Sequence, residues 1–378
     1  MSKRMLYVAP ALNTGGVGSV LRGLICGLAQ AGWEVHLACY EGAAPDMAAS
    51  LAKSAKLHDI GTSCMLRGLR PAIIAWKLRK LILKLKPDII NAHSFDADLL
   101  SARALKDIAA PLLVTYHTFS YMRTAGAHAS DYARYAPRIS GIIAVSHALE
   151  AALKNIPELS CCPIRVIWNA PDIRFFESIC PQERAAMRAR LGAGDGELLI
   201  GFVANFQPGK RQTLLAEAFS RLPKNTRLAF MGGTSNTAVL LETKRILSAH
   251  DALDRCVFVE HESDSRPFLQ ACDIYAHPSC SEAFSVALAE ATACGLPIAA
   301  MRVGGNMELA LEGRNALVVE ADDIGAFAAA LGKLAASAEL RRQLGAASRE
   351  IALERVHPEK HLKAYLELYE RVAAGGRA

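Results

Sequence analysis

The chain alternates short apolar runs with longer segments of helical periodicity, and it does so twice. The first half predicts strands at MLYVAP, EVHLACY, KPDIINAH, PLLVTYH, SGIIAVS and VIWNAPD (166–172). The pattern then restarts, and strands are predicted at ELLIGFVANF, TRLAFMGG, CVFVEH, DIYAHPS, LPIAAMRVGG and NALVVEA. Because strands that alternate with helices are typical of βαβ units, we expect an α/β protein with parallel sheets.

A length of 378 residues fits two domains better than one core. The predicted divisions are 1–172, 173–355 and an amphipathic terminal helix in 356–378 that packs back towards the N-terminal domain. Ligands of open parallel sheets bind outside the carboxyl ends of the strands. With two such domains, the expected site is the cleft between them.

Several protein classes are disfavoured by composition. There is no run of eighteen apolar residues, so no spanning helix is expected, and MSKRMLYVAP reads as a first buried strand and not as a signal peptide. The 10 cysteines include no C-x-x-C pair and no zinc-type spacing with histidine. A reducing, cytoplasmic setting therefore fits best.

Positive charge is concentrated in the N-terminal half. Residues 1–170 hold 19 Lys/Arg against 11 Asp/Glu, and 67–86 (RGLRPAIIAWKLRKLILKLK) holds seven basic residues and no acid. Apolar residues interleave with these cations: Ile73, Trp76, Leu78 and Leu81. This segment is either a surface helix that touches anionic lipid or an ordinary helix with a basic outer face. A nucleic-acid partner is not expected, because no binding module accompanies the charge.

Two glutamates in SEAFSVALAE (281–290) flank a predicted helix start. Ser285 is a plausible N-cap, so Glu282 lies in the preceding loop and Glu290 lies inside the helix. The helix N-terminus between them can bind phosphate, and carboxylates can accept hydrogen bonds from hydroxyls. This arrangement suits a diphosphate flanked by hydroxylated groups, as in a nucleotide-sugar. The alternative is a loop charge and an exposed helix residue.

The segment 277–319 resembles the donor-binding segment of retaining glycosyltransferases of family 4, which have the GT-B fold. The resemblance rests on a series of residues in the family's order: Pro278, Ser279, Glu282, Phe284, Ser285, Glu290, Cys294, Gly295, Pro297, Gly304, Gly305 and Glu308. It continues at NTGGVGSVLRGL, KPDIINAH, VTYHTF, AVSHALEAAL and VIWNAPD. The implied fold is two Rossmann-like domains whose parallel sheets face each other across a cleft.

The resemblance also implies roles for individual residues. Glu282 would hold donor sugar hydroxyls and His117 would lie near the reacting centre, which makes both catalytic. Glu290 would hold the ribose. The diphosphate would contact Lys210 and the backbone N–H groups near Phe284, Ser285 and Val286. His261 would lie near the nucleobase, and His93 is a weaker candidate near the acceptor.

The glycine loop and the lysine loop each carry an ambiguity. Gly15 and Gly16 either approach the diphosphate and acceptor or form a plain strand-to-helix turn. In ANFQPGKRQTLL, Asn205 stands where the family has arginine, and Arg211 is the only nearby substitute for that charge. We count Asn205 among the donor-binding candidates because of its position.

No metal or other cofactor is expected. Asp96 and Asp98 resemble the metal motif of the other large glycosyltransferase fold, but here they open an apolar helix. Carboxylates at a helix start complement the helix dipole without any metal.

The sequence therefore predicts a retaining, hexosyltransferase-type enzyme. It would move a sugar from a UDP- or GDP-sugar to a glycan or lipid-linked acceptor hydroxyl, in polysaccharide, lipopolysaccharide or glycolipid assembly. The expected place is the cytoplasm or the inner face of the cytoplasmic membrane. Two alternatives stay open: a nucleotide-sugar epimerase or hydrolase on the same fold, and a non-catalytic sugar-binding relative.

Overall fold

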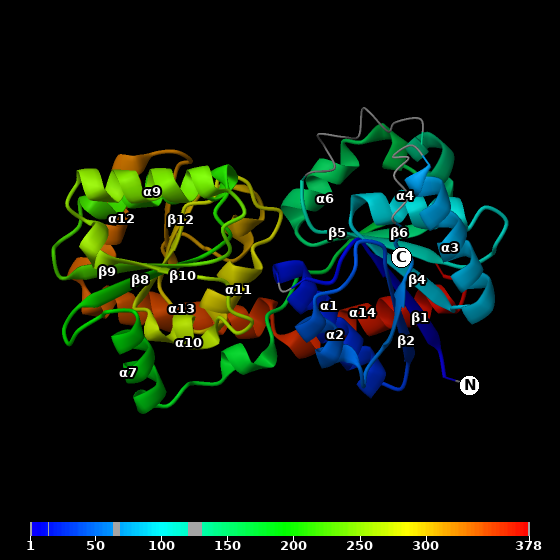
Figure 1. Ribbon diagram of the computed structural model, residues 1–378, viewed down its shortest axis with the longest axis horizontal. Coiled ribbons are helices and arrows are strands. Elements are labelled where there is room, and N and C mark those ends of the chain that lie inside the picture. The colour runs from blue at the N-terminus through cyan, green and yellow to red at the C-terminus, as the bar shows by residue number, and fades with distance from the viewer. Residues whose placement is uncertain (1, 14, 63–68, 120–130, 377–378) are drawn as a thin grey trace. The chain divides into compact units, whose positions relative to one another are not determined.

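The computed structural model describes residues 2–13, 15–62, 69–119 and 131–376. The chain divides into two compact units (Figure 1). Unit 1 comprises Met1–Asn169 and Pro358–Ala378, and unit 2 comprises Ala170–His357. Each unit is built on a parallel sheet with helices packed on it, so the predicted fold class is confirmed.

In the described part of unit 1, seven parallel strands lie in the order β3-β2-β1-β4-β5-β6-β7. Their bounds are β1 Arg4–Ala9, β2 Glu34–Cys39, β3 Lys56–Asp59, β4 Ile89–His93, β5 Leu112–Tyr116, β6 Ile139–Ala144 and β7 Ile164–Val166. The helices that accompany them are α1 Gly16–Gln30, α2 Pro45–Leu51, α3 Arg70–Leu85, α4 Phe95–Ala104, α6 His147–Lys154 and α14 Pro358–Ala373. The central strands are buried on both faces, which explains their near-continuous apolar sequences.

One strand prediction for unit 1 was wrong, and one strand of its sheet was missed. The strand expected at 166–172 ends at Val166. Ile167 N still donates to the Ala144 carbonyl at 3.0 Å, but the Trp168 carbonyl accepts from His361 Nδ1 instead, and Pro171 has no N–H to donate. The edge strand β3 was missed, because three of its four residues, KLHD, are polar and none is fully buried.

Helix α14 contributes to the core of unit 1 although its residues follow all of unit 2 in the chain. It packs against α1 and β4. Tyr369 Oη lies 3.2 Å from Tyr7 Oη and accepts from Asn91 Nδ2 at 2.7 Å. A Cβ at Gly27 of α1 would lie 2.6 Å from the Leu362 side chain, so the two helices meet closely there.

In unit 2, six parallel strands lie in the order β10-β9-β8-β11-β12-β13. Their bounds are β8 Leu198–Val203, β9 Thr226–Met231, β10 Cys256–Val259, β11 Ile274–His277, β12 Ile298–Met301 and β13 Ala316–Val319. The helices are α7 Pro181–Arg190, α8 Gln212–Ser220, α9 Thr237–Ala249, α10 Arg266–Ala271, α11 Val286–Ala293, α12 Ile324–Ala336 and α13 Ala338–Arg355. All six strands that the sequence predicted for this half are confirmed.

Within the described residues, we find no helix with the length and apolarity that a membrane crossing requires.

Candidate functional site

The sheet order of unit 2 changes direction between β8 and β11, and two of the predicted site residues meet there. The loops that leave the carboxyl ends of these two neighbouring strands carry Lys210 and Glu282. Open parallel sheets bind their ligands at such a switch point. The order of the strands thus brings together two segments that are 72 residues apart.

The two loops are tied to each other through their backbones and through an ion pair. Cys280 N donates to the Gly209 carbonyl at 3.0 Å, and Gly305 N donates to the Glu282 carbonyl at 3.0 Å. Lys210 Nζ donates to Glu282 Oε1 at 2.5 Å. The Glu282 side chain is only 11% exposed, so this pair is held away from bulk water. An ammonium has three protons, and two remain for further acceptors.

His277, the last residue of β11, belongs to the same cluster and was not predicted. Its Nε2 atom lies 3.7 Å from Glu282 Oε1. Burial is the main reason why the pKa of His277 falls to about 4, with the positive charge of Lys210 acting in the same direction. The ring is therefore uncharged at neutral pH, and Lys210 is the cation that balances Glu282. The sequence does contain a signal for this residue, because the histidine in DIYAHPS stands at the end of a predicted strand, where ligands of parallel sheets bind.

The predicted start of α11 is confirmed. Ser285 is the N-cap, and its Oγ accepts from Leu288 N at 3.2 Å. The N–H groups of Val286 and Ala287, in the first turn, have no acceptor within the helix. Phe284 and Val286 are themselves buried, so their backbones and not their side chains are suited to contact a ligand.

Glu290 lies in the interior of α11 and is half-buried. The reading of this residue as an exposed helix position is therefore wrong. Its Oε2 atom accepts from Ser265 Oγ at 2.9 Å. Burial raises the pKa of Glu290 to about 7, the Ser265 hydrogen bond opposes this rise, and the carboxylates of Asp264 and Asp172 add to it. Ser265 was not predicted, since a serine in a polar loop gives no distinctive signal.

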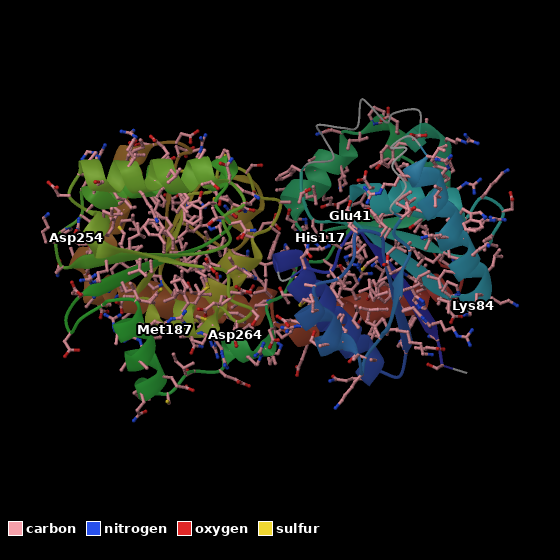
Figure 2. All side chains as sticks on the ribbon, in the orientation of Figure 1. Glu41, Lys84, His117, Met187, Asp254 and Asp264 are labelled. Carbon is pink, nitrogen blue, oxygen red and sulfur yellow. The ribbon has the colours of Figure 1, made fainter. Side chains whose placement is uncertain are left out.

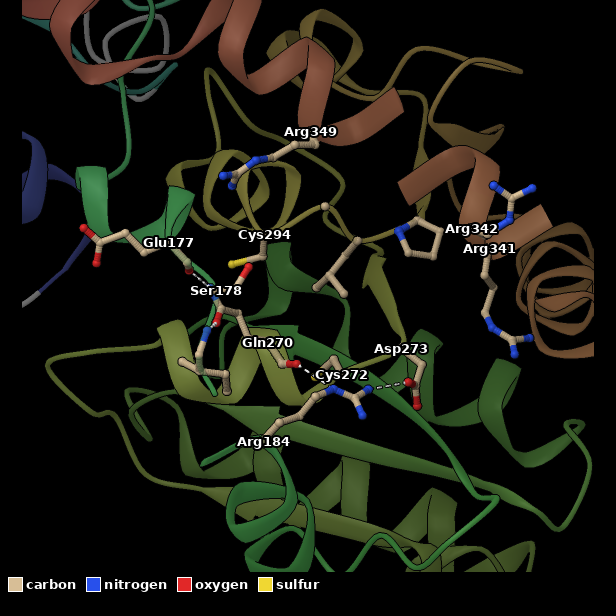
Figure 3. Close-up of a pocket in the computed structure, with 14 residues that line it drawn as sticks. Glu177, Ser178, Arg184, Gln270, Cys272, Asp273, Cys294, Arg341, Arg342 and Arg349 are labelled. Atoms are coloured by element: carbon tan, nitrogen blue, oxygen red, sulfur yellow. Dashed lines mark hydrogen bonds and ion pairs between the residues drawn. The ribbon is translucent and has the colours of Figure 1, made fainter. Parts of the chain in front are cut away.

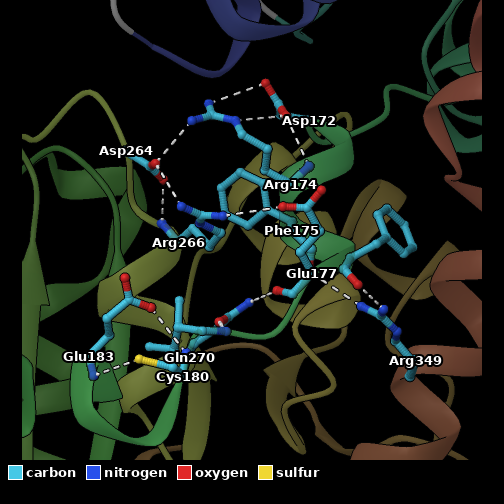
Figure 4. A network of polar contacts seen from close by, with 12 residues as sticks. Asp172, Arg174, Phe175, Glu177, Cys180, Glu183, Asp264, Arg266, Gln270 and Arg349 are labelled. Carbon is cyan, nitrogen blue, oxygen red and sulfur yellow. Dashed lines mark hydrogen bonds and ion pairs between the residues drawn. The ribbon is translucent and has the colours of Figure 1, made fainter. Parts of the chain in front are cut away.

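Figure 4 shows a network of charged side chains, and two of its carboxylates, Asp264 and Asp172, act on the pKa of Glu290. Arg174 contacts Asp172 and Asp264, and Arg266 lies 3.7 Å from Asp264 and 3.6 Å from Glu177. These residues come from the first segment of unit 2 and from the start of α10.

The arginine that the family pattern has at position 205 is absent here. Neither Asn205 nor Arg211 supplies its positive charge next to Lys210. Asn205 Oδ1 accepts from Gly233 N at 2.9 Å, which joins the loops after β8 and β9. Arg211 Nη2 lies 3.0 Å from Asp322. His261 follows β10 and is exposed, and the structure gives it no contact with the Lys210–Glu282 pair.

In unit 1, the predicted residues lie at the carboxyl ends of β1, β4 and β5. Gly15 caps α1 after β1, and Gly16 begins that helix. Both are exposed, and a Cβ at Gly15 would meet open space, whereas a Cβ at Gly18 would lie 1.8 Å from the Asn13 carbonyl oxygen. The local fold therefore requires glycine at 18, and the sterics of this structure do not explain glycine at 15.

His117 follows β5 and is buried against His93, the last residue of β4. His93 Nδ1 lies 3.0 Å from His117 Nε2 with the rings stacked. Figure 2 labels His117 in unit 1. Burial, with the nearby His361 ring, lowers the pKa of His117 to about 4. A neutral imidazole is thus present at the carboxyl edge of this sheet.

Asp96 and Asp98 lie in the first turn of α4, as predicted. Asp98 is buried, and it accepts hydrogen bonds from Tyr116 and, at 2.7 Å, from Tyr132. Burial raises its pKa to about 7. Among the described residues, no three His, Cys, Asp or Glu side chains are grouped so that they could hold a metal ion.

A separate hollow of about 560 Å³ in unit 2 contains none of the predicted site residues (Figure 3). Its lining includes Arg184, Gln270, Cys294 and Arg349. The guanidinium groups there already have protein partners: Arg184 contacts Asp273, and Arg349 donates to backbone carbonyls.

Solved structures with the same architecture define the class of fold. The structure of Anabaena Alr3699/HepE in complex with UDP and glucose superposes with a TM-score of 0.83 at 20% identity, over 97% of this chain and 98% of that one. WaaG, a glycosyltransferase involved in lipopolysaccharide biosynthesis, gives a TM-score of 0.73 at 16% identity, over 95% and 99% of the two chains. The fold is GT-B.

Sequence comparison then identifies the family. Residues 14–175 match the model of Glycosyltransferase Family 4, and residues 183–351 match that of Glycosyl transferases group 1. D-inositol 3-phosphate glycosyltransferase of Xylanimonas cellulosilytica is 28% identical over 298 residues, 75% of this chain and 71% of that protein. Against its counterpart in Mycobacterium sp. (strain KMS), the match covers 57% of the relative's length. The chain belongs to glycosyltransferase family 4.

Proposed function

We propose that this chain transfers a hexose-type sugar from a UDP- or GDP-sugar to an acceptor hydroxyl with retention of the anomeric configuration. The observation that carries the proposal is the placement of the Lys210–Glu282 pair beside the N-terminus of α11, with Glu290 further along the same helix. The solved structure of HepE with UDP and glucose supports this kind of donor.

Each group has a role in this proposal. Lys210 and the N–H groups at the start of α11 bind the diphosphate and stabilise its charge as it leaves. Glu282 accepts hydrogen bonds from donor sugar hydroxyls, and Glu290 accepts them from the ribose. The departing phosphate assists deprotonation of the acceptor. Unit 2 is thus the donor side and unit 1 the acceptor side, and His117 of unit 1 contacts the donor sugar near the reacting centre.

The testing experiment is a thermal-shift panel of UDP, GDP, ADP, TDP and their common sugars, with and without Mg²⁺. A ligand that binds only the native state raises the melting temperature by mass action. A strong hit that Glu290→Ala abolishes supports the proposal. If every member leaves the melting temperature unchanged, the non-catalytic alternative is favoured. If sugar is released or isomerised without any acceptor, the epimerase or hydrolase alternative is favoured.

Substitutions of the two glutamates should impair different steps, nucleotide binding for Glu290 and turnover for Glu282. Glu290→Ala removes charge-assisted hydrogen bonds to the nucleoside, so nucleotide affinity should fall by about 10- to 100-fold. Glu282→Ala should mainly lower kcat, because its contacts are made near the reacting centre. Calorimetry and initial rates measure the two effects. Glu242→Ala, which removes an exposed partner of Arg245 on α9, is the matched control. Equal, small losses in both site variants would contradict these roles.

The proposed acceptor is a glycan or a lipid-linked molecule, as the lipopolysaccharide role of WaaG suggests. Helix α3 supports a membrane-surface setting. Its buried face is formed by Ile74, Ala75, Leu78 and Ile82. Large apolar side chains recur every seven residues on the outside, where Leu69, Trp76 and Leu83 are all about half exposed. Arg67 of the predicted basic segment lies outside the described residues.

The cations of α3 fall into two groups. Lys77 donates to the Gly61 carbonyl, and Arg79 donates to the Ala104 carbonyl, so both are tied to the protein. Lys80 and Lys84 are exposed, and Figure 2 labels Lys84 on α3. Lys80 Nζ lies 3.7 Å from the centroid of the Trp76 ring. Exposed lysines around an apolar stripe suit an anionic bilayer surface.

Charge removal should therefore weaken vesicle binding. Replacing Lys80, Lys84 and Lys86 with glutamine should reduce affinity for phosphatidylserine-containing vesicles by roughly 100-fold, at about 1 kcal/mol per lysine. Vesicle flotation and Trp76 fluorescence measure this. Replacement of the exposed lysines Lys53, Lys224 and Lys333 is the matched control. Unchanged flotation would leave α3 as an ordinary surface helix.

A further inference from the structure

A chain of polar contacts leads from the first segment of unit 2 to Glu290. Arg174 lies in a short 3-10 helix, Ile173–Phe176, that follows the first residues of this unit. Its Nε atom donates to Asp172 Oδ1 at 3.1 Å, and its Nη1 atom donates to Asp264 Oδ2 at 3.2 Å (Figure 4). One guanidinium therefore holds two carboxylates that are 92 positions apart in the sequence.

Asp264 continues this chain of contacts towards Glu290. Its second oxygen, Oδ1, accepts from Arg266 N at 3.0 Å, which fixes the turn that precedes α10. Ser265 lies between these two residues, and its Oγ donates to Glu290 Oε2 at 2.9 Å. The position of the Ser265 hydroxyl thus depends on a turn that Arg174 anchors.

We propose that Arg174 is a positioning residue for the nucleotide-binding carboxylate: by holding Asp172 and Asp264, it fixes Ser265 against Glu290 and keeps Glu290 available to the hydroxyls of the donor's ribose. The inference rests on the proposed function, because it assigns a nucleoside to Glu290. It adds a residue that does not itself touch the ligand.

The electrostatic part of this inference has a definite sign. Charged and titratable groups surround Glu290. Asp172 and Asp264 act on its pKa, Glu290 in turn acts on the pKa values of Tyr275 and Cys294, and Arg266 and Arg349 act on that of Cys294. The carboxylates of Asp264 and Asp172 raise the pKa of Glu290, and Arg174, which is paired with both of them, brings a positive charge to the same group of side chains. Because a nearby cation lowers the pKa of a carboxyl group, we infer that Arg174 opposes this rise. Without that guanidinium, Glu290 remains protonated to a higher pH. A protonated carboxyl is the weaker acceptor for ribose hydroxyls.

The test is the affinity for a nucleotide-sugar from pH 5.5 to 9. The probe is UDP-glucose, or GDP-mannose if the panel selects guanine, because a sugar-linked diphosphate does not titrate in this range. The variants are Arg174→Gln, Arg174→Lys and Glu290→Gln, together with the double variant Arg174→Gln/Glu290→Gln. Arg227→Gln is the matched control, since Arg227 pairs with Glu197 at 2.7 Å at the opposite, amino-terminal edge of the sheet.

Arg174→Gln should move the midpoint of the pH dependence upward by about half a unit to one unit, with affinity about two- to fivefold lower at pH 7 and close to wild type at pH 9. Arg174→Lys should restore the profile in large part, and Arg227→Gln should match wild type. When Glu290 is already glutamine, adding Arg174→Gln should not alter how the affinity for the nucleotide-sugar depends on pH. Melting temperatures report any general loss of fold.

Two results would overturn the inference alone: an unchanged midpoint in Arg174→Gln, or an equal loss of affinity at every pH that follows the melting temperature. If the wild-type chain binds no nucleotide-sugar at all, the proposed function fails and the inference fails with it. If wild-type binding depends on pH and Glu290→Gln abolishes that dependence, the proposed role of Glu290 stands whatever Arg174 does.

Discussion

Replacing Lys210 with methionine is expected to lower kcat by about 100- to 1,000-fold, the usual cost of removing one preorganised group that stabilises charge in a transition state. Lys210 Nζ lies 2.5 Å from Glu282 at the switch point of the sheet, and the arginine that other family members place nearby is Asn205 here. Asn205 is bonded to Gly233, and Arg211 is paired with Asp322. The leaving diphosphate would therefore depend on Lys210 more than it does in enzymes that have both cations.

Steady-state kinetics with the donor found in the panel measures this effect. Lys210→Met also leaves the Glu282 carboxylate without its cation, so the double variant Lys210→Met/Glu282→Gln separates the two causes. Compared with Lys210→Met, the double variant should have a higher melting temperature but an equally low kcat. Lys210→Arg should keep part of the activity, and Lys224→Met, an exposed lysine of the same unit, should keep all of it. A loss of less than tenfold in Lys210→Met would contradict the assignment.

The chain should also lose stability steeply as the pH falls from about 6.5 to 4. His117 and His361 are buried in unit 1, and burial lowers the pKa of each to about 4 from an ordinary value of 6.5. The native state then binds fewer protons than the unfolded state. The stability that these groups contribute is fully present above pH 6.5 and is lost as the pH falls through 4. Each shift corresponds to about 3 kcal/mol, so the two together are comparable with the net stability of a domain.

Chemical denaturation at a series of pH values measures the free energy of unfolding directly. In His361→Asn, the free energy of unfolding should fall less steeply at low pH, because the substitution removes a titrating ring and keeps a donor near the Trp168 carbonyl. His250→Asn, at an exposed histidine of unit 2, should leave the curve unchanged. His277 acts in the same direction as His117 and His361, since its pKa is also about 4. A free energy of unfolding that stays constant from pH 7 to 4.5 would contradict this account.

The sequence was most informative where one physical pattern determines structure locally. The inner strands of unit 2, β8, β9, β11 and β12, are largely buried, so their sequences are mostly apolar. The edge strands β10 and β13 are only partly buried but are still mostly apolar, and all six strands were predicted. The relative positions of Glu282, Ser285 and Glu290 could be predicted, because the N-cap fixes where the helix begins and the helix geometry then fixes how far along it each residue lies. The edge strand β3 was not predicted because KLHD contains a single apolar residue, Leu57.

The rest of the site depends on contacts that cross long stretches of sequence. Lys210 and Glu282 meet only because β8 and β11 are neighbours in the sheet, and strand order is not written in any local pattern. His277 is buried beside Glu282 because it ends a strand, and Ser265 reaches Glu290 from another helix start. The role of Asn205 as a link between two loops likewise became visible only in the structure.

Helix α14 has a consequence for the order in which the protein can form during synthesis. The ribosome makes Pro358–Ala373 only after all of unit 2 has been translated, yet Tyr369 of this helix completes the hydrogen bonds of Tyr7 and Asn91 in unit 1. Unit 2 can close its own core while the nascent chain is still lengthening. The part of unit 1 that is translated first cannot complete its core until α14 has been made. Until then the apolar surface that α14 covers is exposed, and a chaperone could bind it at this stage.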